Sequence, residues 1–529
     1  MRNKKLQVWL PLIFSLVMIC GMFFGFKLHQ QTGSTRGFFK TDKRSALQEA
    51  LDLIKNRYVD SLGMDSLQDD AMEGIMNHLD PHSVYIPASN LSEANEDIVG
   101  NFEGIGVEFN IFKDTVHILH VIAKGPGDKA GLQIGDKILK VDDSSIVSKT
   151  LPSTAIKRMI RGKGGTKVKL TLMRNNTIKN YDVVRGTIPI PSLDAFYMLD
   201  STKGYIKLNK FSETTHKEFI SAIEDLQKKG LKSLVLDMRG NGGGLVSQAV
   251  ALADDFLDGD KLIVYTQGSN TPRREYKAGK QGIFEKGELV VLIDELSASA
   301  TEILAGALQD WDRATIIGRR SFGKGLVQEQ YGLNDGSAIR LSVARYFTPS
   351  GRSIQRPYDK GKKIYMDELL ERYNNGQMLY ADSFHANTTQ SFKTNGGRKV
   401  FGGGGIMPDI FVAVDSGLYT RSITELYLEG RFNNFVYTYY INHLPEFQSY
   451  KTPTDFANRY RNTSDAWQQL VNYAMKDSIN LSKIPPLEKM EVQNRMKAYL
   501  ARFRWRTQGF YEVSGSTDKV IQKAKEVLN

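Results

Sequence analysis

Apolar and polar positions alternate in short blocks through the centre of the chain. Mostly apolar runs at residues 233–237, 289–293 and 314–318 have the length and the flanking turn residues of buried strands. Residues 215–229, before the first run, and residues 301–311, between the second and the third, repeat apolar side chains at helical spacing. Strands that alternate with helices in this way predict an α/β core for the middle of the protein.

The pattern changes on both sides of this core. Residues 42–78 place apolar side chains at helical spacing, residues 100–187 combine glycine-rich turns with strand-like runs, and helical periodicity returns after Val414. These changes predict five regions along the chain. They are an N-terminal segment at 1–30, a helical region at 31–96, a glycine-rich domain at 97–187, the core at 188–414 with a long polar insertion at 356–403, and a helical C-terminal domain at 415–529.

The N-terminal segment contains an almost wholly apolar run, residues 8–26, which follows the basic residues Arg2, Lys4 and Lys5. A run of this length with basic residues before it is typical of a helix that crosses a membrane with its basic end inside. We therefore expect a single-pass inner-membrane anchor, with the rest of the chain exported to the periplasm. A cleaved signal peptide is the alternative, although no small-x-small cleavage site closes the run.

The composition narrows the chemistry that the chain supports. A single cysteine among 529 residues excludes an intramolecular disulfide framework and a cysteine-based zinc cluster. The eight histidines show no metal-ligand spacing, so we expect neither a metal nor another cofactor. The net charge of +11 arises from basic residues interleaved with acidic ones and accompanies no nucleic-acid-binding motif. We therefore do not expect nucleic acid as a partner.

Two positions in the core have residue types that fit nucleophilic catalysis. Ser299 stands between the predicted strand at 289–293 and the predicted helix at 301–311, where a serine either caps the helix or stands exposed as a nucleophile. Lys324 lies between two glycines. It is therefore either a surface lysine in a flexible loop or a lysine held in a tight, water-poor place, where it can act as a general base. Spacing alone favours the cap and the surface lysine.

The segments around these two positions carry a resemblance to a known family. Ser-Ala-Ser-Ala-Thr-Glu-Ile at 297–303 and Phe-Gly-Lys-Gly-Leu-Val-Gln at 322–328 resemble motifs of the C-terminal processing, or tail-specific, proteases. The resemblance implies a serine endopeptidase with a ClpP/crotonase-like α/β (α+β) core, an inserted PDZ domain, an N-terminal helical region and a C-terminal helical extension. It also implies that Ser299 is the nucleophile, that Lys324 is the general base and that Gln328 orients the lysine.

A third motif, Asp-Met-Arg-Gly-Asn-Gly-Gly-Gly at 237–244, is similar to the segment that lies beside the nucleophile in this family. The resemblance implies that one N–H group of the oxyanion hole comes from Gly243 or Gly244. The second N–H group comes, by the same resemblance, from Ala300, directly after the serine. A phosphate-binding loop is the alternative for such a glycine-rich segment, but no Gly-Lys-Ser/Thr sequence follows it.

The glycine-rich domain at 97–187 resembles a PDZ domain in three consecutive motifs, of which the first is Gly-Ile-Gly-Val-Glu-Phe at 104–109. A PDZ domain binds a free peptide C-terminus through backbone N–H groups and the edge of a strand, so the expected partners are protein substrates with free C-terminal tails. By this resemblance, four residues receive the peptide: Gly104, Ile105, Gly106 and Val107. A binding or scaffolding protein with a catalytically silent core is the alternative, and the presence of the complete serine and lysine pair favours the protease.

Several other features keep an open interpretation. His82, in a Leu-Asp-Pro-His-Ser stretch shared with the family, is expected to serve packing rather than catalysis. Glu302 either complements the dipole of its helix or supports the catalytic residues. Arg161 is a candidate for coupling peptide binding to the active site. The insertion at 356–403 departs from the family and fits a lid, a partner site or a surface elaboration. The C-terminal domain fits assembly into a homo-oligomer or binding of an adaptor protein.

Overall fold

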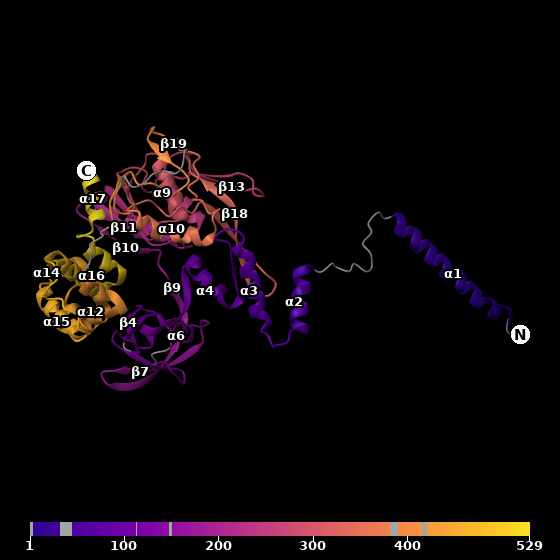
Figure 1. The fold of residues 1–529 in the computed structure, drawn as a ribbon, viewed down its shortest axis with the longest axis horizontal. Helices are drawn as coiled ribbons and strands as arrows, with labels where there is room; N and C mark the ends of the chain where they lie inside the picture. Colours follow the sequence, from indigo (N-terminus) through magenta and orange to yellow (C-terminus); the bar gives the residue numbers. More distant parts are fainter. Residues whose placement is uncertain are drawn as a thin grey trace. The chain divides into compact units, whose positions relative to one another are not determined.

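The computed structural model describes residues 4–31, 45–112, 114–147, 151–380, 390–414 and 420–528. The chain divides into two compact units, Met1–Ala71 and Met72–Asn529. Figure 1 labels their helices and strands. The first unit contains α1 (Lys4–Gln31), α2 (Ala46–Arg57) and the beginning of α3 (Met64–Asn77). The site lies in the second unit, which contains all the remaining elements.

The structure corrects the prediction for the N-terminal segment. A helix that crosses a membrane needs about 20 consecutive, mostly apolar residues. Within the described part of the chain, no helix meets both the length and the apolarity that such a crossing requires. The predicted single-pass inner-membrane anchor at 1–30, from which the periplasmic location of the catalytic part was inferred, is therefore wrong.

The centre of the second unit is a six-stranded sheet with the order β10-β11-β12-β15-β16-β21. Its strands are β10 (Leu193–Met198), β11 (Lys203–Leu208), β12 (Ser233–Asp237), β15 (Leu289–Ile293), β16 (Thr315–Gly318) and β21 (Ile410–Phe411). The β10–β11 pair is antiparallel, and all other neighbours run parallel. Because β12 and β15 are adjacent and parallel, their carboxyl ends meet at one edge of the sheet, and this edge carries the candidate site.

Three helices of the core follow strands of this sheet: α7 (Thr215–Lys228), α8 (Val246–Asp254) and α9 (Ala300–Asp310). Every residue of α9 is buried, which its many small and aliphatic side chains permit. Its Ile303 and Leu304 belong to the same apolar cluster as Leu236 of β12. The α/β core predicted from alternating blocks is therefore confirmed, and α9 is its central helix.

A second sheet of five strands contains the lysine segment. It has the order β1 (Val84–Ile86), β18 (Ala338–Phe347), β13 (Leu262–Gln267) and β14 (Arg274–Lys277), and β17 (Leu326–Gly332) also pairs with β18. Strand β1 pairs with β18 in antiparallel register, Val84 opposite Arg340. The segment before β1 is thereby brought from far away in the sequence to the neighbourhood of Lys324. After β18 the insertion forms α10 (Lys362–Asn374) and a hairpin of β19 (Ser391–Lys393) and β20 (Lys399–Phe401).

The glycine-rich domain has its own sheet and its own core. The sheet has the order β3 (Val107–Phe112), β4 (Thr115–Val121), β5 (Lys137–Val141), β7 (Lys167–Arg174) and β8 (Thr177–Val184), with β6 (Ser144–Ser145) beside β5. Helices α5 (Pro126–Lys129) and α6 (Ser153–Ile160) complete it. Strands β2 (Asn101–Gly104) and β9 (Gly186–Pro189) pair where the chain enters and leaves the domain, after α4 (Ala88–Val99). Within the described residues β3 pairs only with β4, so one of its edges is open.

The C-terminal region is helical, as its periodicity predicts. It contains α11 (Arg421–Tyr427), the 3₁₀ turn η2 (Leu428–Gly430), α12 (Arg431–Asn442), α13 (Leu444–Ser449), α14 (Pro453–Arg459), α15 (Thr463–Met475), α16 (Pro486–Ser514) and α17 (Lys519–Val527). Its aromatic core includes Phe112 and Leu119 of the glycine-rich domain, so the two domains share apolar packing. The five domain boundaries, and the proposed role in assembly or adaptor binding, remain predictions.

Replacing Leu236 with alanine tests the core. The side chain is fully buried in β12, so Leu236→Ala is expected to lower the free energy of unfolding by about 2–5 kcal/mol. Chemical denaturation followed by circular dichroism measures this loss. The control is Leu370→Ala on α10, where the side chain is 65% exposed and the expected change is below about 0.5 kcal/mol. Equal losses in the two variants would contradict the assignment of the core.

Candidate active site

Ser299 lies in a strained turn at the carboxyl edge of the central sheet. Strand β15 ends at Ile293 and α9 begins at Ala300, so Ser299 directly precedes the helix. Its backbone angles, φ 57° and ψ −117°, lie in a region that residues other than glycine rarely adopt. Such strain persists only where surrounding contacts hold the backbone, and this turn has several of them.

The carboxylate of Glu302 joins the Ser299 turn to the segment that contains Lys324. One oxygen, Oε2, accepts hydrogen bonds from the N–H groups of Ser299 (2.8 Å) and Lys324 (2.9 Å). The other oxygen, Oε1, accepts hydrogen bonds from the N–H of Gly323 (2.7 Å) and the hydroxyl of Ser321. The side chain is fully buried, and burial raises the pKa of Glu302 to about 7. A single buried carboxylate therefore connects two segments that are separate in the sequence.

Tyr346 of β18 connects the same two segments on their carbonyl side. Its hydroxyl lies 2.6 Å from the carbonyl oxygen of Lys324 and 3.1 Å from that of Ser299. The side chain is almost completely buried, so these two carbonyl groups replace the hydrogen bonds that water would otherwise provide. Glu302 and Tyr346 together satisfy backbone groups of both segments.

The side chain of Lys324 is held by Gln328. Its Nζ donates a hydrogen bond to Oε1 of Gln328 at 2.7 Å, and the amide nitrogen of Gln328 donates in turn to the carbonyl oxygen of His82. Burial lowers the pKa of Lys324, the charge of Arg340 lowers it further, and two nearby carboxylates oppose the shift. The amine is thus displaced toward the neutral form that a general base requires.

The turn that contains His82 is fixed by Asp80. The Asp80 carboxylate accepts hydrogen bonds from the N–H groups of His82 (2.8 Å) and Ser83 (3.0 Å). The imidazole ring packs edge-on against Tyr365, and burial together with the charge of Lys324 lowers the pKa of His82 to about 4. The ring is therefore neutral at pH 7. It is the backbone carbonyl of His82, rather than its ring, that contacts the amide of Gln328.

The glycine-rich loop after β12 contacts the Ser299 turn directly. The carbonyl oxygen of Asn241 accepts a hydrogen bond from the N–H of Ala298 at 3.0 Å. A Cβ atom on Gly243 would lie 2.8 Å from the Cβ of Ser299, so a side chain does not fit there. The N–H of Gly243 donates to Oδ1 of Asn241 at 2.9 Å. The N–H of Gly244, by contrast, has no hydrogen-bond acceptor among the residues described.

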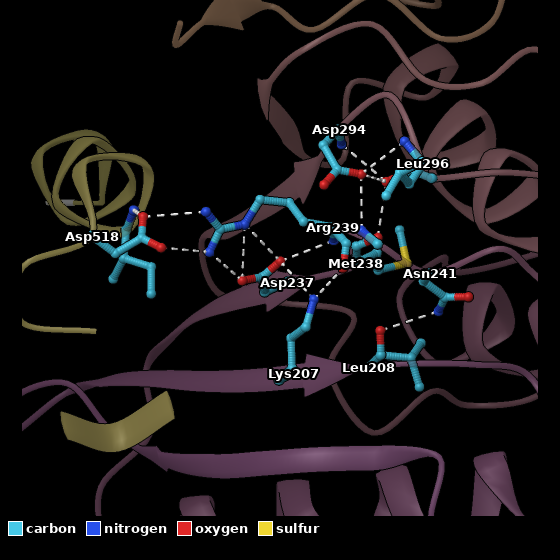
Figure 2. A network of polar contacts seen from close by, with 12 residues as sticks. Lys207, Leu208, Asp237, Met238, Arg239, Asn241, Asp294, Leu296 and Asp518 are labelled. Atoms are coloured by element: carbon cyan, nitrogen blue, oxygen red, sulfur yellow. Dashed lines mark hydrogen bonds and ion pairs between the residues drawn. The ribbon is translucent and has the colours of Figure 1, made fainter. Parts of the chain in front are cut away.

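An ion-pair network holds the beginning of this loop, as Figure 2 shows. Asp237, at the end of β12, is buried between the side chains of Arg239 and Lys207, with its Oδ1 3.3 Å from the Lys207 Nζ. Burial by itself raises the pKa of a carboxyl, but the charges of Arg239 and Lys207 hold the pKa of Asp237 well below its usual range. Arg239 also contacts Asp518 at 3.0 Å, and Asp518 caps α17 by accepting the N–H of Val520. The C-terminal helix therefore braces the loop beside Ser299.

The four residues predicted to receive a peptide lie in the glycine-rich domain, at the junction of β2 and β3: Gly104, Ile105, Gly106 and Val107. Two of their carbonyl groups accept hydrogen bonds within the domain: the Ile105 carbonyl from the N–H of Gly127, and the Gly106 carbonyl from the N–H of Ile122. Val107 is the first residue of β3 and pairs with Val121 of β4. The other edge of β3 has no partner strand among the described residues, and binding of a peptide by these four residues remains a prediction.

Arg161 lies at the end of α6 and connects this domain to α4. Its guanidinium group is 2.7 Å from the carboxylate of Glu96 and stacks over the ring of Phe102 at 4.4 Å. The proposed coupling of peptide binding to the active site stays a prediction, and this ion pair is the contact through which Arg161 reaches α4.

Sequence reasoning brought the right segments together but missed some of the side chains between them. Ser299, Ala300, Lys324, Gln328 and the two glycines all lie around the beginning of α9. Glu302 had two open interpretations, although the spacing Ser-x-x-Glu is the signature of a capping box and indicated that its carboxylate returns to the Ser299 backbone. Tyr346, Asn241 and Asp518 gave no signal of this kind, because their contacts depend on how distant segments pack.

Three family models match separate parts of the chain. Peptidase family S41 matches residues 202–361, which include the Ser299 turn and the lysine segment. A PDZ domain matches residues 104–184. A family of unknown function (DUF8443) matches residues 422–506 in the helical C-terminal region.

Curated relatives align with the chain over most of their own length. Carboxy-terminal processing protease CtpA of Bacillus subtilis (strain 168) is 37% identical over 358 residues, which are 67% of this chain and 74% of that protein. The carboxy-terminal-processing protease of Bartonella bacilliformis is 36% identical over 336 residues, 62% of this chain and 76% of that protein. Among solved structures, the photosystem II D1 C-terminal processing protease is 29% identical and has a TM-score of 0.35. The match covers 58% of this chain and 83% of the chain of that protease.

Replacing Glu302 with glutamine tests the connection between the two segments. A glutamine side chain has only one acceptor oxygen, so its NH₂ group must face either the Ser299 and Lys324 pair of donors or the Gly323 and Ser321 pair. We expect the free energy of unfolding to fall by about 1–3 kcal/mol and the turnover of a protein substrate to fall with it. Denaturation and cleavage assays measure both, with the exposed Glu371→Gln as the control. Wild-type values in Glu302→Gln would contradict the importance of this carboxylate.

Proposed function

The chain belongs to peptidase family S41, the carboxy-terminal processing serine endopeptidases with a PDZ domain, and from this premise we propose that Ser299 and Lys324 form its catalytic dyad. The observation that supports the dyad best is the position of Glu302, whose Oε2 accepts the N–H groups of both residues. The backbones of the proposed nucleophile and the proposed base are therefore held against the same atom. The lowered pKa of Lys324 supports the role of base.

In this mechanism the Ser299 Oγ attacks the carbonyl carbon of the scissile peptide bond, and the neutral Lys324 amine takes the hydroxyl proton. When the C–N bond breaks, the Lys324 ammonium returns that proton to the leaving amine, and the acyl group remains on Ser299 as an ester. Water then attacks the ester carbonyl carbon while Lys324 takes a proton from it. The acyl C–O bond breaks, the Lys324 ammonium returns that proton to the Ser299 Oγ, and the carboxylic acid product leaves. Gln328 keeps the amine oriented through its 2.7 Å hydrogen bond.

The negative charge that develops on the substrate oxygen needs donors near Ser299. Ala300 is the first residue of α9, and an N–H group at this helix position has no acceptor within the helix. Of the two candidate glycines, Gly244 is favoured because the N–H of Gly243 already donates to Asn241. We assign the oxyanion hole to the N–H groups of Ala300 and Gly244.

The PDZ domain supplies the selection of substrates by their tails. In this proposal the loop Gly104 to Val107 and the open edge of β3 bind a free C-terminus, while cleavage takes place at Ser299. The rival function is tail binding without proteolysis, since related folds host different activities. The two functions differ in whether a bound protein is cut.

Alanine at either position of the dyad is expected to lower the cleavage rate of an unfolded protein substrate by roughly 10⁴-fold. Ser299→Ala removes the nucleophile and Lys324→Ala removes the base, but neither changes the PDZ domain. Binding of a tail peptide, measured by fluorescence anisotropy, is therefore expected to stay within about twofold of wild type. Cleavage that persists in both variants would place the activity elsewhere, and a wild-type protein that binds tails without cutting any of them would favour the scaffold.

The pH profile provides an independent test of the base. Lys324 works in its neutral form, so kcat rises with pH through the pKa of Lys324, which lies below the ordinary 10.5. Arg340 lowers this pKa by its charge, so Arg340→Gln is expected to raise it and to move the rise in kcat to higher pH. The control is Arg345→Gln on the same strand, whose charge is not among those that act on Lys324. A profile that is identical in wild type and Arg340→Gln would contradict Lys324 as the titrating base.

A further inference from the structure

The insertion contributes a helix, α10, that contacts the backbone just before Lys324. Arg372 of α10 is buried, and its guanidinium donates to the carbonyl oxygens of Ser321 (2.8 Å) and Phe322 (3.1 Å). These are the last two carbonyl groups before Gly323 and Lys324. Glu302 therefore binds the N–H groups of Gly323 and Lys324, whereas Arg372 of the insertion binds the carbonyl groups of the two residues before them.

The orientation of Arg372 is itself fixed by a charged cluster. Glu368, one helical turn earlier, accepts a hydrogen bond from the Arg372 Nε at 2.9 Å and forms ion pairs with Arg320 (2.8 Å) and Arg356. Burial together with repulsion from Arg372 lowers the pKa of Arg320 to about 10, which remains far above neutral pH. Arg320 is therefore charged, and Glu368 holds the three guanidinium groups together. A guanidinium that is held at its Nε has little freedom to rotate away from the loop carbonyls.

A second connection runs from α10 to Lys324 through aromatic side chains. The Arg356 guanidinium lies over the rings of both Phe322 (4.0 Å to its centroid) and Tyr365 (3.8 Å). The Tyr365 hydroxyl is 2.9 Å from Nε2 of His82, and the backbone of His82 holds the Gln328 that binds the Lys324 amine. Tyr365 thus acts on Lys324 through two intermediate residues.

The lysine segment needs such external contacts because of its own sequence. Glycine on both sides of Lys324 gives the backbone more conformational freedom than other residues allow, and Gly323 uses it with a φ of 92°. The lysine side chain adds its own rotational freedom, which must be restricted for the amine to meet a hydroxyl. Hydrogen bonds that fix the carbonyl groups just before the glycine reduce both kinds of freedom.

We propose that α10 of the insertion is a positioning element for the general base, in which Arg372 fixes the backbone before Lys324 and Tyr365 fixes the His82 and Gln328 pair that holds its amine. This inference rests on the dyad proposed above. Neither Arg372 nor Tyr365 touches the reacting atoms, so both are positioning residues. The insertion is then part of the catalytic apparatus of this chain rather than a surface elaboration.

The test is a comparison of kcat, KM and pH profile in Arg372→Gln. The variant loses the bonds to the two loop carbonyls, so kcat is expected to fall by about tenfold or more while KM stays within about twofold. Release of the segment also lets water reach the amine, so the rise in kcat with pH is expected to move upward. The charged groups that face Lys324 are Arg340 of β18, Glu302 of α9 and Asp80 before β1, with His82 neutral. Arg372 is not among them, so the shift reports position rather than lost charge.

Two further variants keep the test decisive. Tyr365→Phe removes only the hydroxyl that contacts His82 and keeps the ring stacking, so it is expected to lower kcat by about threefold without loss of folding. Should Arg372→Gln unfold, as judged by circular dichroism, Tyr365→Phe alone decides the matter. Lys363→Gln, on the exposed face of the same helix, is the matched control and is expected to retain wild-type kinetics.

The outcomes separate this inference from the dyad itself. The role of α10 is overturned, and the dyad stays intact, if Lys324→Ala is inactive while folded Arg372→Gln keeps the wild-type kcat and pH profile. If Arg372→Gln is unfolded, the same conclusion follows from wild-type kcat and pH profile in Tyr365→Phe. Full activity in Lys324→Ala overturns the dyad and with it the inference. Equal losses in Arg372→Gln and Lys363→Gln would show a general disturbance of the helix, which also overturns the assignment to Arg372.

Discussion

The candidate site depends on one buried carboxylate. Glu302 receives three backbone N–H groups and one hydroxyl from two segments that no secondary structure joins directly. Burying a carboxylate costs free energy unless its oxygens are fully hydrogen-bonded, so the folded state requires both segments to be in place. The same requirement that satisfies Glu302 brings Ser299 and Lys324 to their positions.

Other parts of the chain converge on this arrangement from different directions. The turn before β1 supplies the His82 carbonyl that holds Gln328, and the C-terminal helix α17 supplies the Asp518 that holds Arg239 beside the glycine-rich loop. The helical C-terminal domain also shares apolar packing with the PDZ domain through Phe112 and Leu119. Regions outside the central sheet therefore stabilise the site rather than merely flank it.

Much of this arrangement was readable from the sequence, for identifiable reasons. The apolar runs at 233–237 and 289–293 agree with strands β12 and β15 because a fully buried strand has a simple pattern. The position of Ser299 before a helix follows from that pattern, and the capping-box spacing of Glu302 was visible beside it.

Contacts between distant segments were beyond sequence reasoning. Nothing in the local pattern relates Tyr346, His82 or Asp518 to the candidate site. Tyr346 contacts the Ser299 carbonyl, His82 contacts Gln328 and Asp518 contacts Arg239, each through the pairing of strands or the docking of a helix. The choice between Gly243 and Gly244 was equally open, and it depends on a single hydrogen bond to Asn241. The apolar run at 8–26 was interpreted as a membrane anchor, which the structure contradicts.

The central claim is that Ser299 carries the acyl group of the substrate during cleavage. The direct measurement is to quench the reaction with acid during the first turnover and to locate the covalent adduct by peptide mapping and mass spectrometry. The account predicts a substrate-derived ester on the peptide that contains Ser299, formed by wild type and absent from Lys324→Ala. An adduct on another residue during substrate cleavage would contradict this claim. Equally fast formation of the ester by wild type and Lys324→Ala would contradict it as well.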